Sequence, residues 1–514
     1  MLDLYKGEIV VDSFLHNLQQ YSMIIEKDSI YQQNTVFSLH RSTQTIILKY
    51  LTKVLNLEKD SQLMESIAKI LEEYLEKISE TAEEVQLKHF LPHLVAFLDK
   101  KLVSEITEAY LNSKLGYFYW TIYRDYKEAI NLIEQSLPVF SKYYKAAHPQ
   151  KAWALGQLGV IYKNSGDIKK GKNYLEESLA VYKSYYGTEN HIKIAWILTP
   201  LASIYRKIEP KKAQDYLERA LSIYKDFYGE DDIKTSEVLG HLGRFHRNMG
   251  HYVKAKDLLE RAILIHDSNS VKKPIEYAWL TINLGIVNRN LGYNEKAKKL
   301  FERGLSINEK TLGKEHIDVG WSRIHLGIIY GNQGNLLMAK QLIQKSLEQY
   351  KQHYGQDHPK TAWASEKLGV IYRESKEYTK ANDMFNQSLD IYREHYGTDS
   401  VQVAFLMHNI GEMKFMEGNL KEAEEYFNKS FEIFQKKNNP EIYRVLGSLI
   451  ELYLKKSVEE NNQNNVNQGQ IYHNKAVYFL SELQKILKIN FPKDSPYVKK
   501  INLKYSTIMK ENIF

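Results

Sequence analysis

A 42-residue internal repeat constrains this chain more than any other feature of its sequence. Small residues recur at this spacing in eight copies, at Ala129, Gly171, Ala213, Ala255, Ala297, Ala339, Ala381 and Ala423. A Leu-Gly or Ile-Gly pair precedes most of them, at Gly159, Gly243, Gly285, Gly327, Gly369 and Gly411. A repeat of this length is one small structural unit that cannot bury its apolar face alone, so neighbouring copies must stack. The period therefore predicts a solenoid.

Each copy has the pattern of two helices. Its first half places apolar or small residues at i, i+3, i+4 and i+7, which is the pattern of an amphipathic helix. A glycine-containing turn follows, and the second half carries the small residue and a bulky residue four positions later. Tyr-Gly ends several copies, and proline begins the next at Pro149 and Pro359, where a first helical turn tolerates it. We therefore expect an all-α fold.

The succession of Leu-Gly and Tyr, then Ala, Phe or Leu, and Ser or Ala resembles the tetratricopeptide repeat. The 42-residue period and the Tyr-Gly-x-x-His-Pro linker resemble its kinesin-light-chain subtype. The resemblance covers residues 101–455 and implies a right-handed superhelical solenoid whose first helices line a concave groove for partner peptides. Copy three departs from the pattern at Pro200, Ala202 and Pro210, and copy one at Pro138, so we expect local bends there.

The regular spacing fails after residue 455. The Asn-rich segment 456–471 is expected to be a loop, because polar tracts of this kind need not pack. Residues 472–514 contain two further amphipathic stretches, which we interpret as degenerate capping helices that give the end of the solenoid a polar face.

The first hundred residues carry no copy of the repeat. Residues 1–56 are expected to form a small winged-helix-like α+β unit with a hairpin at 21–26 and 35–40, and residues 57–100 a helical connector. Phe37–Arg41 with Gln44 resembles the segment that closes the winged helix of NB-ARC-type signalling ATPases. Leu91-Pro92-His93 resembles a helix that follows that module. The resemblance implies a regulatory or sensor arm of such an ATPase system.

The sequence shows no active-site motif, so we predict a protein that is not an enzyme and has no cofactor. Gly166–Asn173 imitates a phosphate-binding loop, but Asn173 stands where Ser or Thr should hold magnesium, so no nucleotide is expected. His241, His246 and His251 would be turned roughly 140° from one another on one helix, so they should not share a metal.

Charge and hydropathy narrow the partners and the location. The net charge of +7 is small for 514 residues, so neither nucleic acid nor a membrane is an expected partner. The chain has no signal-peptide pattern at its start and no apolar run long enough to span a bilayer, so a cytoplasmic location is expected.

The face of each first helix opposite its apolar positions is predicted to line the groove. Its residues form two columns, Trp153, Trp196, Trp279, Trp321 and Trp363, and Asn248, Asn290 and Asn332, and a third column lies on its flank: Arg206, Arg247, Arg289 and Arg373. Tryptophan and arginine are enriched at binding hot spots, and asparagine pairs with a peptide backbone of any sequence. In the competing interpretation, the tryptophans pack against the preceding repeat's second helix and the arginines pair with local acids.

These observations favour a non-enzymatic scaffold or adaptor that binds a protein or an extended peptide in its groove. The first alternative is the sensor arm of an NB-ARC-type signalling ATPase system. The second alternative is a cargo adaptor like kinesin light chain. Such an adaptor should carry a long heptad coiled coil, and the helical stretch at 61–86 is too short for one.

Overall fold

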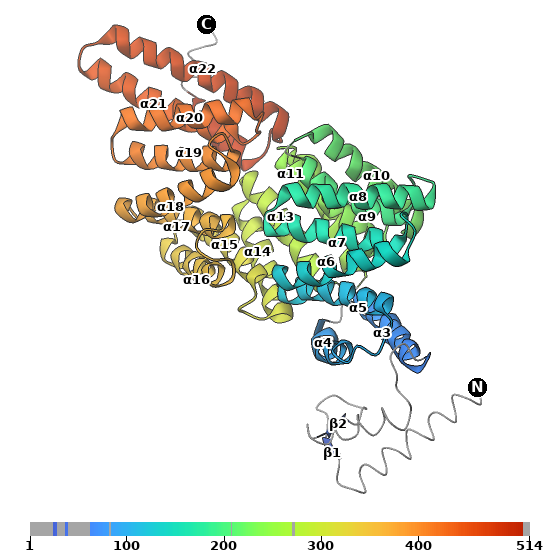
Figure 1. The fold of residues 1–514 in the computed structure, drawn as a ribbon. Coiled ribbons are helices and arrows are strands. Elements are labelled where there is room, and N and C mark those ends of the chain that lie inside the picture. Colours follow the sequence, from blue (N-terminus) through green and yellow to red (C-terminus); the bar gives the residue numbers. More distant parts are fainter. Residues whose placement is uncertain are drawn as a thin grey trace. The chain divides into compact units, whose positions relative to one another are not determined.

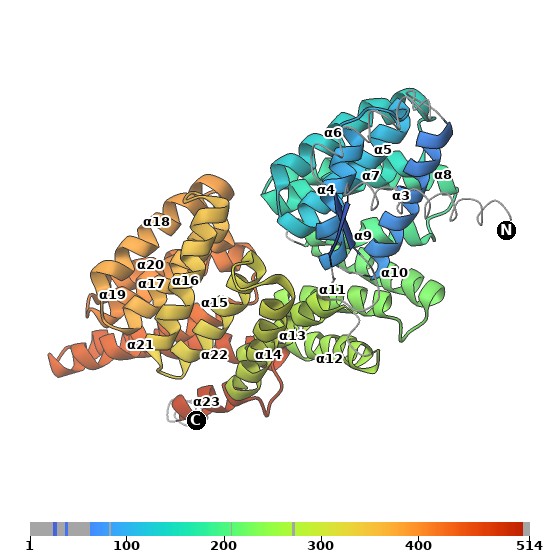
Figure 2. The same cartoon turned by 90° about the horizontal axis from the view of Figure 1, so that it is seen from below.

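The computed structural model describes residues 24–27, 36–39, 62–81, 84–206, 208–269 and 273–506. Helices make up nearly all of this part of the chain (Figures 1 and 2). The chain divides into two compact units, Met1–Tyr185 and Tyr186–Phe514.

The described part of the first unit begins with the antiparallel strands β1 (Ile24–Lys27) and β2 (Val36–Leu39), which confirm the strand pair of the expected hairpin. The helices expected around that hairpin lie outside the described residues, so the winged-helix unit stays a prediction. The unit continues with α3 (Gln62–Thr81), α4 (Glu84–Leu98), α5 (Glu105–Phe118), a π-helical turn (Tyr119–Tyr123), α6 (Tyr126–Tyr143), α7 (Pro149–Ser165) and α8 (Ile168–Tyr186), which ends at the unit boundary.

The second unit continues the helical hairpins, in which a first helix is followed by a second helix packed against it. Its helices are α9 (Ile192–Tyr205), α10 (Pro210–Tyr228), α11 (Ile233–Asn248), α12 (Tyr252–Ser268), α13 (Pro274–Asn290), α14 (Asn294–Leu312), α15 (Ile317–Asn332), α16 (Leu336–Tyr354), α17 (Pro359–Glu374), α18 (Tyr378–Tyr396), α19 (Val401–Met416), α20 (Leu420–Lys436), α21 (Ile442–Asn462), α22 (Val466–Asn490) and α23 (Pro496–Lys504). The expected helical repeat is confirmed.

The glycine of each Leu-Gly pair lets the two helices of a hairpin approach closely. A Cβ atom on Gly285 would lie 2.6 Å from a ring carbon of Phe301, and one on Gly411 would lie 2.6 Å from the ring of Phe427. Both phenylalanines are buried in their second helices. The glycine column and the bulky column of the sequence are therefore two halves of one packing contact.

The small column of the second helix is polar in several copies, and its hydroxyl joins the two helices. Ser178, Ser388 and Ser430 each donate to a backbone carbonyl of the preceding first helix, at 2.6, 2.9 and 2.8 Å. The buried serine thus finds an acceptor, as a buried hydroxyl must.

The histidine of the linker caps the next first helix. His358 Nδ1 accepts from the backbone N–H of Lys360 at 3.1 Å, and its ring stacks on Tyr354 with centroids 4.5 Å apart. Pro359 follows at the first helical position, where its missing N–H leaves no donor unsatisfied. The linker motif is therefore a helix start.

The structure corrects two expectations about irregular segments. The segment 456–471 is not a loop, because α21 runs to Asn462 and α22 begins at Val466. Asparagine disfavours a helix only weakly, and packing outweighs that preference here: Ser457 donates to the buried Gly469 carbonyl at 2.8 Å. The short turn of copy three does not contain Pro210, which is the first residue of α10. Pro138 and Pro200 lie inside the helices α6 and α9.

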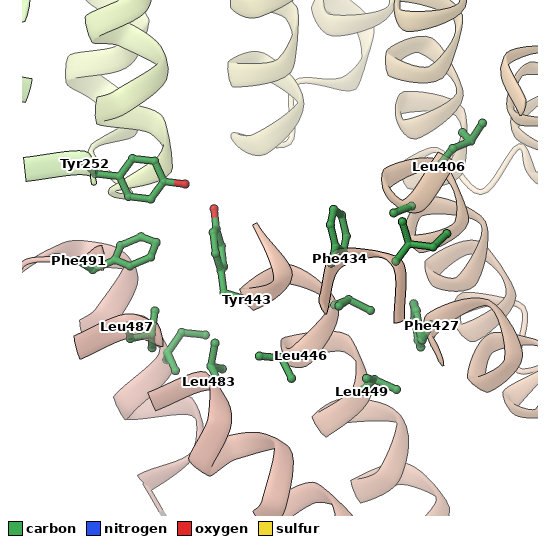
Figure 3. Packing of buried hydrophobic residues seen from close by; sticks show 14 of the residues in the cluster. Tyr252, Leu406, Phe427, Phe434, Tyr443, Leu446, Leu449, Leu483, Leu487 and Phe491 are labelled. Atoms are coloured by element: carbon green, nitrogen blue, oxygen red, sulfur yellow. The ribbon is translucent and has the colours of Figure 1, made fainter. Parts of the chain in front are cut away.

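The C-terminal helices of the second unit contact repeats that lie far back in the sequence. The Tyr252 hydroxyl donates to Glu441 at 2.7 Å, and its ring meets Phe491 with centroids 5.0 Å apart (Figure 3). Gly292 has no room for a Cβ, which would lie 2.8 Å from the Tyr497 nitrogen. The turns after α11 and α13 therefore pack against the segments that flank α21 and α22, and the second unit closes on itself.

Candidate functional site

The first helices of the second unit form one layer, in which α9, α11, α13, α15, α17, α19 and α21 each contact the next. We call the side chains of the three predicted columns on these helices the first-helix face. It carries all the predicted site residues except Trp153, which lies in α7 of the first unit.

The tryptophans are half-buried and contact the preceding first helix. Trp279 packs on His241 with ring centroids 5.1 Å apart, and Trp363 lies 5.5 Å from the ring of His325. In the first unit, Trp153 meets Tyr117 of α5 at 5.9 Å. Trp363 also packs against an apolar cluster that contains Ile343 and Leu347 of the preceding second helix α16, which is the kind of packing that the competing interpretation expected. Trp196 and Trp321 are half-buried as well.

Arg373 is a structural residue. It is buried and forms ion pairs with Glu412 at 2.5 Å and Glu374 at 2.7 Å. Burial acts to raise the pKa of Glu412, but Arg373, His408 and Ser448 outweigh it and lower that pKa to about 2. This arginine follows the competing interpretation, in which the column pairs with local acids.

Arg206, Arg247 and Arg289 behave differently, and Arg244 joins them. We call these four side chains from α9, α11 and α13 the arginine cluster; all are half-buried, and none forms an ion pair with a carboxylate of the described residues. Three of the four side chains have neutral partners among the described residues. Arg247 donates to Asn283 at 2.6 Å and to Asn248 at 2.9 Å, Arg289 donates to Asn290 at 3.4 Å, and Arg244 lies over Trp279.

Burial and mutual repulsion lower the pKa values of the arginine cluster. Burial, together with Arg244, Arg206 and Arg289, lowers the pKa of Arg247 to about 9. Burial and Arg206 lower the pKa of Arg244 to about 10, and burial with Arg444 lowers that of Arg289 to about 10. All of these groups remain charged at neutral pH, so the cluster is a concentrated positive charge.

One carboxylate lies beside the cluster, brought there by the C-terminal segment. Glu441 pairs with Arg444 at 2.5 Å and accepts from Tyr252. Its charge acts to raise the pKa values of Arg247 and Arg289 without offsetting their burial. Arg444 and Tyr252 thus hold this carboxylate, and the cluster has only its more distant field.

The three asparagines of the predicted column differ in their exposure to solvent. Asn248 is half-buried, Asn290 is buried and Asn332 is exposed at the end of α15. His325 is buried with no partner for its Nδ1 atom, and burial together with Arg289, Arg247 and Lys367 holds its pKa well below the ordinary range. A neutral histidine with a free ring nitrogen therefore lies within the field of the arginines.

Sequence reasoning missed Arg244. It occupies a column that is Val160, Ile286, Ile328 and Val370 in other copies, so its departure from an apolar column was a usable signal. The contribution of Glu441 could not be found in this way, because it comes from a segment nearly two hundred residues away that reaches the cluster only when the unit closes.

The segment Gly166–Asn173, which resembles a phosphate-binding loop in sequence, has a structural role. Gly166 caps α7 with a positive φ of 107°, and Gly171 is buried in α8, where a Cβ would lie 2.8 Å from the Lys163 nitrogen. The three histidines do not lie on one helix as expected: α11 ends at Asn248, and the following turn brings His251 Nδ1 to 3.3 Å from His246 Nδ1. In the described part of the chain, no group of three or more His, Asp or Glu is placed to hold a metal ion.

The stacked hairpins with their aligned first helices define a helical-repeat protein. The family model of the tetratricopeptide repeat matches residues 107–184, 165–226, 193–266, 276–352, 324–394 and 388–436. These overlapping matches cover more than half of the chain, which therefore belongs to the tetratricopeptide repeat family. Among the described helices, none combines the length and the apolarity needed to cross a membrane.

Solved structures of low sequence identity are similar to this chain. A Rap protein complexed with competence and sporulation factor is 12% identical, with a TM-score of 0.52, over 74% of this chain and 99% of that chain. The apo quorum sensor NprR from B. thuringiensis is 17% identical, with a TM-score of 0.48, over 72% of this chain and 99% of that chain. At such identities the likeness to the Rap protein shows the fold alone. A search of curated proteins found no match.

Proposed function

We propose that the chain is a non-enzymatic scaffold that binds an extended peptide or protein segment along the first-helix face of its second unit. The observation that carries this proposal is the composition of that face. Half-buried tryptophan, arginine and asparagine side chains from consecutive first helices contact one another there, as Trp279, Arg244 and Arg247 do with their neighbours. These residue types supply apolar area, charge and backbone pairing to a peptide.

The half-burial of these side chains supports binding. Side chains that only brace the repeats would be expected to find full burial and matched partners, as Arg373 does. The Rap structure, which shares the fold, contains competence and sporulation factor. That observation supports the same use of the fold here without specifying a ligand.

The test begins with a random dodecapeptide library displayed on phage and selected on the full chain. The strongest peptide is then measured against an Asn248→Ala/Asn332→Ala variant of the first-helix face. Two neutral hydrogen bonds are worth about 0.5–1.5 kcal/mol each, so affinity should fall about tenfold. The matched control, Gln341→Ala/Lys345→Ala on exposed positions of α16, should bind normally. Equal binding by both variants would contradict the proposal.

The sensor-arm alternative depends on residues 1–56, of which the structure describes only the strand pair. The cargo-adaptor alternative depends on a coiled coil, and α3 extends over only 20 residues. Both stay predictions without an observation in their favour.

A further inference from the structure

A hollow of about 380 Å³ lies on the last long hairpin of the second unit, which consists of α21 and α22. It is lined by Tyr453 of α21 and by Ile471, Asn474, Lys475, Tyr478 and Phe479 of α22. None of these side chains belongs to the first-helix face. Small-molecule sites in proteins have volumes of about 300–1,000 Å³, so the hollow has room for a ring system with one polar group.

The sequence explains why this hairpin has a hollow where the preceding hairpin has a close contact. Tyr453 stands 42 residues after Gly411, at the position where the preceding hairpin has no room for a Cβ atom. Its buried ring lies parallel to the ring of Phe479, with centroids 5.8 Å apart, and 6.0 Å from the ring of Tyr472. Aromatic surface therefore replaces the direct approach of the two helices.

The same hairpin extends beyond its neighbours. α21 and α22 contain 21 and 25 residues, against 16 and 17 in α19 and α20, and their tip reaches past both of these helices (Figures 1 and 2). Ile471 and Tyr478 border the hollow on this hairpin, and both are exposed. Because the end of a solenoid normally has a polar outer face, exposed apolar side chains beside a hollow favour a binding role.

Two hydrogen-bond donors stand at the edge of this apolar surface. Lys475 Nζ lies 5.0 Å from the centre of the Tyr453 ring, and within the described ranges it forms no ion pair. Gln470 donates to the Asn474 Oδ1 atom at 3.0 Å, which occupies the amide oxygen and leaves the NH₂ group of Asn474 as a donor. An ammonium and an amide NH₂ side by side suit a carboxylate.

The carboxylate of Glu424 in α20 does not fill this role. It pairs with Lys456 and accepts from the Tyr453 hydroxyl at 2.7 Å. Burial acts to raise the pKa of Glu424, but Lys456 and Tyr453, with the charge of Lys475, outweigh it and lower that pKa. Since Glu424 is held by Lys456 and Tyr453, Lys475 remains available to a second carboxylate.

We propose that the hollow binds a free small molecule made of a flat aromatic ring system with a carboxylate. The ring packs against Tyr453, Tyr478 and Phe479, since aromatic rings favour stacked and edge-to-face contacts with one another. The carboxylate pairs with Lys475 and accepts from Asn474. This site is independent of the proposed function, because it shares no side chain with the first-helix face.

The experiment uses the full chain and three probes of one size in isothermal titration calorimetry: 2-naphthoate, the neutral 2-naphthamide, and the saturated acid decalin-2-carboxylate. Naphthoate should bind with a Kd below about 1 mM. The amide lacks the charge and the saturated acid lacks the aromatic ring, so each should bind at least about threefold more weakly.

The protein variants locate the binding site. Lys475→Gln should weaken naphthoate to the level of the amide and leave the amide unchanged. Asn474→Trp fills the hollow from an exposed position and should abolish the binding of both probes. Lys488→Gln is the matched control, since it removes the same charge from an exposed position near the other end of α22, and it should bind naphthoate within about twofold of the parent chain. All three variants should keep the melting curve of the parent, because the substituted side chains are exposed.

Several results would overturn this proposal. Naphthoate that does not bind at about 1 mM, or that binds no better than the amide and the saturated acid, would reject the predicted ligand. Naphthoate binding that survives Asn474→Trp would reject the hollow as its site. Sedimentation velocity tests the other occupant: a parent chain that self-associates beside a monomeric Asn474→Trp variant would assign the hollow to a contact between two copies of the chain. None of these outcomes depends on peptide binding to the first-helix face.

Discussion

Arg247→Gln should stabilise the free protein, although most substitutions of a half-buried residue destabilise. Burial and three neighbouring arginines lower the pKa of Arg247 from its ordinary value of 12.5 to about 9. Each tenfold change in a protonation equilibrium is worth about 1.4 kcal/mol, so the charge destabilises the folded state by up to about 5 kcal/mol at neutral pH. The penalty is fully present below about pH 9 and is lost as the pH rises through and above that value.

The net gain should be smaller than this limit. Solvent screens a half-buried charge, and the glutamine side chain replaces only part of the hydrogen bonding to Asn248 and Asn283. We expect an increase of about 1–2 kcal/mol in the free energy of unfolding, measured by urea denaturation at neutral pH. The increase should shrink as the measurement moves above pH 9.

Arg373→Gln is the matched control, since it removes the same charge from the same column. It leaves the carboxylate of Glu412 without its main partner, so stability should fall by about 2–3 kcal/mol. Opposite signs for the two variants would separate the cluster from the structural pair. If Arg247→Gln destabilises the chain as much as Arg373→Gln does, the unneutralised cluster is not strained and the reasoning fails.

Three further predictions concern the fold. Burial, with neighbouring cations, lowers the pKa of His358 to about 4, so stability should be lost as the pH falls from 6.5 towards 4. His358→Asn keeps a helix cap and should therefore reduce the drop in melting temperature between pH 7 and 5, whereas an unchanged drop would contradict this role of His358. Gly285→Ala should cost about 1–3 kcal/mol in urea denaturation, whereas Gly447→Ala, whose Cβ meets nothing, should cost nothing; equal effects would refute the packing role of the Leu-Gly pair. Tyr252→Phe should lower thermal stability by about 1–2 kcal/mol, because Glu441 loses a buried donor, and an unchanged melting curve would show that this contact is unimportant.

The repeat was predictable because its period and columns are local properties of the sequence. The glycine and bulky columns predicted the hairpins, and the observed contact of Gly285 with Phe301 explains why both columns exist. The Asn-rich segment was wrongly predicted to be a loop, because its composition reflects only weak helix propensities. Composition contains no information on the packing that holds Ser457 against Gly469. The closure of the second unit depends on the sum of many small rotations between repeats, which no single copy encodes.

The candidate site was predictable as a face, but the roles of its residues were not. Helical geometry places Arg247 and Arg373 in one column, yet one holds neutral amides and the other two carboxylates. The difference has two causes. One is Glu412, which pairs with Arg373 and lies at the repeat position that Arg244 occupies in another copy. The other is Glu441, whose charge acts on Arg247 once the second unit has closed. Counter-ions of this kind come from neighbouring repeats and distant segments, so a single helix pattern cannot assign them.

The most direct test of the account asks which side of a repeat a bound peptide touches. A photo-crosslinking amino acid is placed at Asn332, exposed at the end of α15, or at Gln341, exposed on α16 of the same repeat. The strongest selected peptide is added, the sample is irradiated, and the cross-linked product is quantified by mass spectrometry. The account predicts efficient cross-linking from position 332 and background levels from position 341. Cross-linking from position 341 alone, or equally from both positions, would contradict binding on the first-helix face.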